Sequence, residues 1–258
     1  MPAAKGGSPS AKRLYHHGDL RRALLEAAWL LVAEKGLAAL TLREVARAVG
    51  VTHAAPYHHF PSRTALLDAL AEDGFRRLDR ALSEAKAEPM QGCPPGTDAA
   101  ELLDRIGRAY VDFACAQPEQ LQVMFRPRHL DSEGPPPPAL AQIGAKAYGH
   151  LSEAVRACQE QGLAPPGDSA ALALSAWSLV HGFATLWIQG QLGDLVPDAA
   201  GFAHQRDQLL RNLQVGWQAA AVTARKDDAA AADQAAKAKV AVSMSSACDG
   251  GLIQTTSG

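Results

Sequence analysis

Residues 41–67 read TLREVARAVGVTHAAPYHHFPSRTALL and predict two short helices separated by a glycine. Thr41 and Glu44 have the spacing of a capping box, in which two side chains satisfy free backbone N–H groups at a helix start. Gly50 marks the end of this first helix, because glycine readily adopts the left-handed conformation found there. Thr52 is predicted to be the N-cap of the second helix. Two short helices joined by a tight turn are typical of a helix-turn-helix motif.

Pro56 falls inside the second predicted helix. With Thr52 as N-cap, the next three residues have N–H groups without helical partners in any case. Pro56 is then the fourth helical residue and removes only the first backbone hydrogen bond. The sequence therefore predicts a short α-helix with proline in its first turn.

Three histidines lie in this segment, namely His53, His58 and His59. Two imidazoles share a helical face at spacings of three or four residues, and none of these pairs has such a spacing. The arrangement does not favour a metal site, and no HExxH motif is present. We expect His53 and one of His58 and His59 to contact bases or phosphates of a nucleic acid. The alternative is that all three are solvated and incidental.

The rest of the chain also predicts helices, because apolar residues recur at intervals of three and four. The stretch 168–192 is the most apolar, so its helix is expected to be buried nearly all round. Residues from about 225 onward are rich in Ala, Lys and Asp and then polar, which indicates a disordered tail. Besides the two short helices of the helix-turn-helix, the predicted helices cover residues 18–36, 61–82, 99–117, 119–127, 139–162, 168–192 and 198–224.

Charge and composition reduce the number of possible classes of function further. Residues 11–63 contain eight Lys and Arg against four Asp and Glu, whereas the whole chain of 258 residues has a net charge of −2. A basic, histidine-rich head on an acidic body suggests that the head meets a polyanion. We find no signal peptide and expect no membrane-spanning segment. The four widely spaced cysteines form no CxxC motif, so a reducing cytoplasm fits best.

The segment 41–67 resembles the DNA-binding segment of the TetR family of transcriptional regulators. A shorter stretch, AWSLVHGFATLW, resembles the Trp-His-Gly signature of one class of TetR C-terminal domains. Val49 and Pro56 depart from the commonest family pattern, which has Ala and then Leu or Ile. The positions that carry the two resemblances are Thr41, Val49, Gly50, Val51, Thr52, Tyr57, Phe60 and Arg63, and then Trp177, His181 and Gly182.

The resemblance implies an all-α fold with an N-terminal three-helix helix-turn-helix DNA-binding domain and a helical ligand-binding and dimerisation domain. It implies a homodimer that binds an inverted repeat in double-stranded DNA and responds to a small-molecule effector, most simply as a repressor, with activation as the alternative. No cofactor, catalytic residue or membrane is implied. The expected divisions are a flexible leader (1–14), the DNA-binding domain (15–63), the ligand-binding and dimerisation domain (64–223) and a disordered tail (224–258).

Candidate site residues follow from the same resemblance. The candidates for DNA contact are Thr41, Arg43, Thr52, His53, Ala54, Tyr57, His58, His59 and Arg63. Thr41, Thr52, Tyr57 and Arg63 are expected to contact phosphates. Arg43 could read a guanine edge, with a plain solvated arginine as the alternative. The candidates for effector contact are Met124, Phe125, Trp177, His181 and Trp187, for which simple core packing is the alternative. For the dimer interface, helix-spaced apolar positions occur at Leu209, Leu210, Leu213 and Trp217, which could equally belong to the core of one chain.

Two other classes of function are weighed against this interpretation. A small helical metal-dependent enzyme would use the histidines, but neither metal-ligand spacing nor a nucleophile–base arrangement can be defended. The other class is a helical adaptor that binds only protein, which salt-dependent binding to DNA would exclude.

Overall fold

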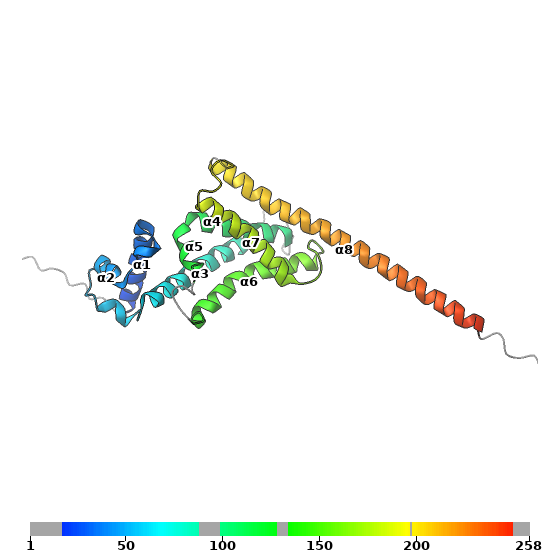
Figure 1. The fold of residues 1–258 in the computed structure, drawn as a ribbon, viewed down its shortest axis with the longest axis horizontal. Coiled ribbons are helices and arrows are strands. Elements are labelled where there is room, and N and C mark those ends of the chain that lie inside the picture. Colours follow the sequence, from blue (N-terminus) through cyan, green and yellow to red (C-terminus); the bar gives the residue numbers. More distant parts are fainter. Residues whose placement is uncertain (1–16, 88–98, 128–133, 197, 250–258) are drawn as a thin grey trace, which may run out of the picture. The chain divides into compact units, whose positions relative to one another are not determined.

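The structure is a computed structural model, and it describes residues 17–87, 99–127, 134–196 and 198–249. The predicted leader (1–14) lies outside these residues. The described residues form α-helices and two short 3₁₀-helices, with no strand among them, so the prediction of an all-α fold is confirmed (Figure 1). The elements are α1 (His17–Lys35), η1 (Leu37–Ala39), α2 (Leu42–Val49), η2 (Ala55–His58), α3 (Arg63–Ala87), α4 (Ala99–Ala116), α5 (Pro118–Met124), α6 (Pro138–Glu160), α7 (Ser169–Ile188) and α8 (Ala199–Asp249).

The chain divides into two compact units. Unit 1 contains residues 1–80 and 116–147, and unit 2 contains residues 81–115 and 148–258. The division differs from the expected boundary at residue 63, because α5 and the first part of α6 group with the N-terminal helices. Contacts between distant parts of the chain decide this grouping, and helix periodicity carries no information about them.

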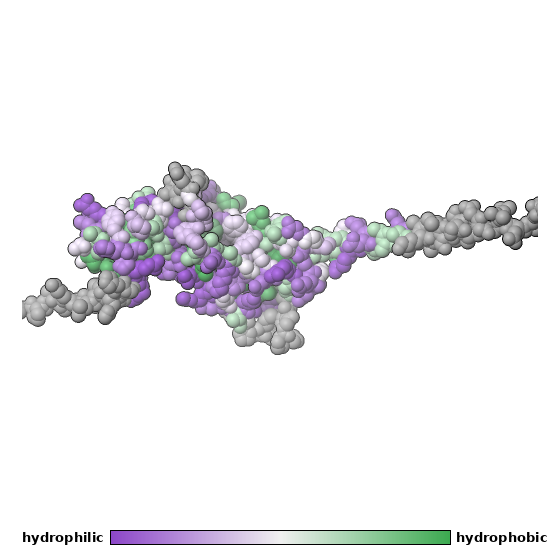
Figure 2. Space-filling model, turned by 90° about the horizontal axis from the view of Figure 1, so that it is seen from below, coloured by the Kyte–Doolittle hydropathy of each residue, from purple (hydrophilic) through white to green (hydrophobic). Residues whose placement is uncertain are grey.

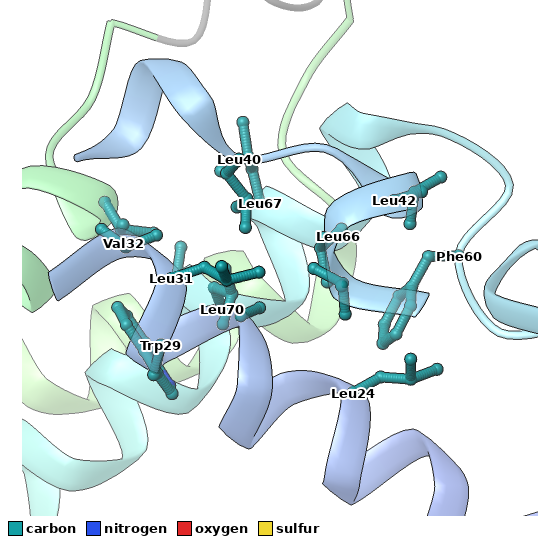
Figure 3. Close-up of a cluster of buried hydrophobic side chains, with 14 of the residues drawn as sticks. Leu24, Trp29, Leu31, Val32, Leu40, Leu42, Phe60, Leu66, Leu67 and Leu70 are labelled. Carbon is teal, nitrogen blue, oxygen red and sulfur yellow. The ribbon is translucent and has the colours of Figure 1, made fainter. Parts of the chain in front are cut away.

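Unit 1 is built around a cluster of leucine, valine and aromatic side chains from α1, α2 and α3 (Figure 3). Leu24 on α1, Leu40 before α2 and Leu67 on α3 are fully buried in this cluster. Burying a leucine stabilises the fold by about 1.5–3 kcal/mol relative to leaving it exposed. This cluster holds the short α2 and η2, which are too short to persist alone.

Helix α5 packs on α3 within unit 1. A Cβ built on Gly74 would lie 2.7 Å from Cγ of Met124, so a larger residue at this position would force the Met124 side chain to shift. The buried guanidinium of Arg126, just after α5, forms an ion pair with Asp68 on α3 and donates to the backbone carbonyl of Val123 at 3.1 Å. A buried charge needs such a partner, so this pair fixes the end of α5 on α3.

In unit 2, α8 is fixed on α4 by packing and charge. Gly107 on α4 gives room to Leu210 on α8, whose Cδ2 would lie 2.6 Å from a Cβ at that position. Arg108 donates to Asp104 and to Asp207, both at 2.5 Å. Leu210 and Trp217 are buried within the chain, so they belong to its core and not to a surface for a second copy.

Helix α7 is less buried than its composition predicts. Only 22% of its most apolar window is buried within the chain, and Leu174, Leu179 and Leu186 are exposed. The expectation of a helix buried nearly all round is therefore wrong for the single chain, because an apolar face can also be reserved for another molecule. By length and composition alone α7 is long and apolar enough to cross a membrane, but core helices of soluble proteins also meet that criterion, so one such helix is weak evidence.

Helix α8 continues far beyond the point where a disordered tail is predicted. It runs from Ala199 to Asp249, so residues 224–249 are helical and only 250–258 lie outside the described residues. Side chains from Arg225 to Ala235 are exposed, so packing does not explain the helix in this stretch. Alanine has the highest helix propensity, and Lys237 pairs with Asp233 one turn away at 2.6 Å.

On the face shown in Figure 2, polar residues (purple) cover most of the surface, with small apolar areas (green) between them.

Candidate DNA-binding surface and effector site

Helix α2 begins and ends as the sequence predicts. Thr41 is its N-cap, and its Oγ accepts a hydrogen bond from the Glu44 amide at 3.1 Å. Gly50 ends the helix with φ of 76°, in the left-handed region that favours glycine. The capping box is only half formed, because the Glu44 carboxylate accepts a hydrogen bond from the Arg47 guanidinium at 2.7 Å and not from the Thr41 amide.

The second element of the motif differs from the predicted α-helix. It is a 3₁₀-helix, η2, whose N-cap position is Ala54 and not Thr52. Pro56 has no N–H to donate to the Thr52 carbonyl, and the Ala55 amide occupies that carbonyl instead at 3.0 Å. The Tyr57 backbone amide likewise donates to the Ala54 carbonyl, three residues earlier, at 3.2 Å. The proline therefore tightens the element into one short turn.

This turn separates exposed from buried side chains. Pro56 and Phe60 are buried, and Phe60 is 2% exposed in the core of unit 1. His53, Ala54, Tyr57 and His58 are exposed, and Tyr57 has 56% of its surface accessible. His59 is half-buried and its ring lies 6.4 Å from the Phe60 ring, so His58 is the better placed of the two alternatives. The exposed four form the surface that we call the reading face.

The remaining candidates border the reading face in the chain. Thr41 and Arg43 lie at the start of α2 and are exposed, and Thr52 is exposed just before the turn. Arg47 pairs with Glu44, whereas Arg43 has no acidic partner among the residues that the structure describes. Arg43 is thus the better placed arginine of α2 for an anion.

Arg63 is engaged differently from the expected phosphate contact. It is half-buried at the first position of α3, and its guanidinium donates to backbone carbonyls of the segment that precedes α2. Nε lies 2.8 Å from the Leu40 oxygen and Nη2 lies 2.9 Å from the Leu37 oxygen. The sequence pattern identifies the position but gives no sign of these backbone partners.

Arg21 is a cation that sequence reasoning missed. It is exposed on α1, and its guanidinium carbon lies 5.4 Å from the centroid of the Phe60 ring. A cation over an aromatic face is held by the ring quadrupole. Arg21 therefore adds a positive charge beside the end of η2, and only the fold brings it there.

Unit 2 contains an aromatic group around two of the effector candidates. The Trp177 and His181 rings lie one helical turn apart on α7, with centroids separated by 5.3 Å. The Tyr110 hydroxyl from α4 lies 2.6 Å from Nδ1 of His181, and the Tyr148 ring meets Trp177 edge-on at 6.2 Å. We call these four residues the aromatic group.

Burial sets the protonation of the aromatic group. It raises the pKa of Tyr110 well above its usual range, which outweighs the lowering by a hydrogen bond with the Trp177 side chain. Burial also lowers the pKa of His181, so the imidazole is neutral at pH 7. An indole N–H only donates, so the Tyr110 oxygen is the acceptor in the hydrogen bond with Trp177.

The other three effector candidates have different contact partners. Trp187 is near the end of α7 and packs on Phe202 of α8, with ring centroids 4.6 Å apart. Met124 and Phe125 belong to unit 1, where Phe125 meets Phe75 edge-on at 5.5 Å. Within unit 2, Trp177 and His181 therefore lie together with Tyr110, whereas Trp187 contacts Phe202.

The described residues contain no group of three or more His, Cys, Asp or Glu side chains that could hold a metal ion. The three histidines of the segment 51–60 thus form no such group.

Comparison with protein families gives two matches. Residues 24–70 match the family described as bacterial regulatory proteins of the tetR family, and residues 103–209 match a tetracyclin repressor-like C-terminal domain. The first match contains α2, η2 and the reading face. The second contains Tyr110, Trp177 and His181.

Individual proteins agree with the family matches. The chain is 42% identical over 50 residues to the HTH-type transcriptional repressor KstR2 of Rhodococcus jostii, a match that spans 19% of this chain and 24% of that repressor. A protein of unknown function from Rhodococcus sp. RHA1 is similar in structure, with a TM-score of 0.65 and 36% identity over 79% of this chain and 100% of that one. The TetR-family regulator PfmR of Thermus thermophilus shares the fold, with a TM-score of 0.54 and 22% identity over 73% of this chain and 97% of that one. The chain belongs to the TetR family of regulatory proteins.

Proposed function

We propose that this protein is a sequence-specific, DNA-binding transcriptional regulator, a repressor released from its operator by a small molecule, and not an enzyme. The observation that carries the proposal is the reading face. Two imidazoles, a phenol and a methyl group stand exposed on a tight turn, while the proline between them and the phenylalanine after them are buried. Such a turn presents side chains to base edges, and the cytoplasm is where it would meet DNA.

We assign the contacts by chemistry. His53 and His58 have ring nitrogens that can hydrogen-bond to base edges, and Ala54 is small enough to allow close approach. The Tyr57 hydroxyl can donate to a phosphate. Thr41, Arg43 and Thr52 border this surface and are assigned to phosphates, with a guanine edge as the alternative for Arg43. His59 is assigned a supporting role against Phe60, because it is half-buried.

The aromatic group is our candidate effector site, within a helical domain that begins after the helix-turn-helix. Its side chains are uncharged at neutral pH, which suits an uncharged or weakly polar organic molecule oriented by few polar groups. An effector acts by its differential affinity for two states of the protein. His181→Ala should therefore weaken release by effector more than it weakens DNA binding. Equal loss of both would make His181 structural and move the effector site elsewhere.

The exposed face of α7 supports a homodimer. Leu174 and Val215 keep 53% and 64% of their surface accessible in the single chain, and Leu179, Leu186 and Val222 are also exposed. We propose that these residues of α7 and α8 pack against a second copy, in place of the buried Leu210 and Trp217. Leu174→Glu should yield monomers in analytical ultracentrifugation, with Leu30→Glu on α1 as the matched exposed control.

The proposed function is tested by selecting genomic fragments that the protein binds. Enriched fragments should share an inverted repeat, and a His53→Ala, His58→Ala double variant should lose the preference for that repeat. Fragments enriched equally by this variant and the unaltered protein would contradict the assignment of the reading face.

A further inference from the structure

Arg63 joins the first turn of α3 to the segment that leads into α2. Nε donates to the Leu40 carbonyl at 2.8 Å and Nη2 donates to the Leu37 carbonyl at 2.9 Å. The planar guanidinium therefore spans both ends of η1 with two fixed donors, a geometry that the single ammonium of lysine does not offer. Arg63 fixes the position of the last residue before Thr41.

The Leu40 carbonyl belongs to the peptide bond that continues to Thr41. The described chain contains no cis peptide, so this peptide is trans and planar, and its N–H points opposite to its carbonyl. With the carbonyl directed at Arg63, the Thr41 amide is directed away from Arg63. Thr41 is exposed.

The Thr41 amide is also left open by its neighbours. The Glu44 carboxylate, which would accept it in a complete capping box, accepts from Arg47 instead. Within the described parts of the chain, this amide has no acceptor. The Thr41 oxygen accepts from the Glu44 amide, which leaves the hydroxyl hydrogen to donate. The start of α2 thus offers an amide and a hydroxyl, both suited to an anion at a helix N-terminus.

We propose that Arg63 is a positioning residue for DNA binding, which acts through the Leu40–Thr41 peptide and holds the Thr41 amide and hydroxyl toward a backbone phosphate. This inference rests on the proposed function. It replaces the expectation that Arg63 itself contacts a phosphate, and it gives the arginine a role that requires its two-donor shape and not its charge alone.

The first test compares Arg63→Lys with Arg63→Gln in operator affinity. Lysine keeps the charge and would still contact a phosphate, but it lacks the two-point hold on Leu37 and Leu40. Positioning predicts that both variants lose about tenfold in affinity, the equivalent of one hydrogen bond to a charged group. Direct phosphate contact predicts that Arg63→Lys stays within about twofold of the unaltered protein.

Salt dependence supplies a second readout. Each cationic phosphate contact adds about 0.9 to the slope of log affinity against log salt. Arg43→Gln, our matched control, should lower the slope by about that amount, whereas Arg63→Gln should lower it by clearly less. A fall of about 0.9 for Arg63→Gln would overturn the proposal.

A double-mutant cycle shows whether Arg63 acts through Thr41. The losses of Arg63→Lys and Thr41→Ala should be less than additive, while those of Arg63→Lys and Tyr57→Phe should add. Additive losses in the first pair would contradict the inference. So would failure of both Arg63 variants to fold by circular dichroism, because Arg63 would then be needed for folding only.

The outcomes separate this inference from the proposed function. If the unaltered protein binds no DNA, the function itself fails. If it binds an operator but Arg63→Lys behaves like the unaltered protein, only the positioning role fails.

Discussion

Tyr110 and His181 are joined by a 2.6 Å hydrogen bond between the phenolic hydroxyl and Nδ1 of the imidazole, which links α4 to α7. Tyr110→Phe should lower the free energy of unfolding by about 1–2 kcal/mol, because the partly buried Nδ1 of His181 loses its hydrogen-bond partner. Urea unfolding measures this. Tyr148→Phe is the control, since its ring contact with Trp177 needs no hydroxyl, and it should cost less than half as much. Equal costs would mean that the hydrogen bond contributes nothing.

The stability of the protein should depend on the protonation of His181. Burial lowers the pKa of His181, so the unfolded chain takes up this proton at higher pH than the folded chain does. The contribution of neutral His181 is therefore complete above pH of about 6.5, the ordinary histidine value, and is lost as pH falls from there toward the folded pKa. Urea unfolding at pH 7.5, 6.5 and 5.5 should show a steeper acid loss for the unaltered protein than for His181→Gln. Parallel curves would contradict this assignment.

The buried pair of Arg126 and Asp68 should be costly to break. Asp68→Ala would leave the guanidinium buried without its carboxylate, and we expect a loss of about 3 kcal/mol in the free energy of unfolding. Glu26→Ala breaks the exposed pair with Arg22 and should change stability by less than about 1 kcal/mol. A loss for Asp68→Ala no larger than that of the control would mean that α5 is not held by this pair.

The exposed part of α8 should be dispensable for folding and DNA binding. Truncation after Lys226 keeps Arg225, which lies against Gly162, and removes a stretch whose side chains up to Ala235 are exposed. The melting temperature and operator affinity should stay nearly unchanged, while the total helical signal in circular dichroism falls. An unchanged total helical signal would indicate that the removed residues are not helical in solution.

Most of the helices follow from apolar spacing and from caps. Thr41 and Gly50 mark helix ends in the sequence and in the structure alike. Periodicity works here because each of these helices buries one face. It fails for residues 225–235, whose side chains are exposed and where alanine propensity accounts for the helix.

The sequence predicts where the DNA-binding surface lies in the chain, but it predicts the local backbone geometry and side-chain partners less well. The reading segment is recognisable from the sequence. Its change from α-helix to 3₁₀-helix depends on which backbone amide donates to the Thr52 carbonyl, because Pro56 has no N–H to donate. The partners of Arg63 and the approach of Arg21 to Phe60 are tertiary contacts that spacing cannot reveal. The sequence of an apolar helix such as α7 also shows the same pattern whether its leucines pack within their own chain or against another copy.

The central claim is that the reading face binds an operator as part of a dimer, and operator binding by Tyr57→Phe tests it most directly. Affinity should be measured by fluorescence anisotropy from 50 to 200 mM salt, on the selected inverted repeat and on an unrelated duplex. The unaltered protein should bind the repeat as two chains and lose roughly 10³-fold or more in affinity over this range. Tyr57→Phe should weaken binding to both duplexes by a similar factor, with no change in melting temperature, because the exposed hydroxyl serves only a phosphate. Salt-insensitive binding, or a variant indistinguishable from the unaltered protein on both duplexes, would contradict the account.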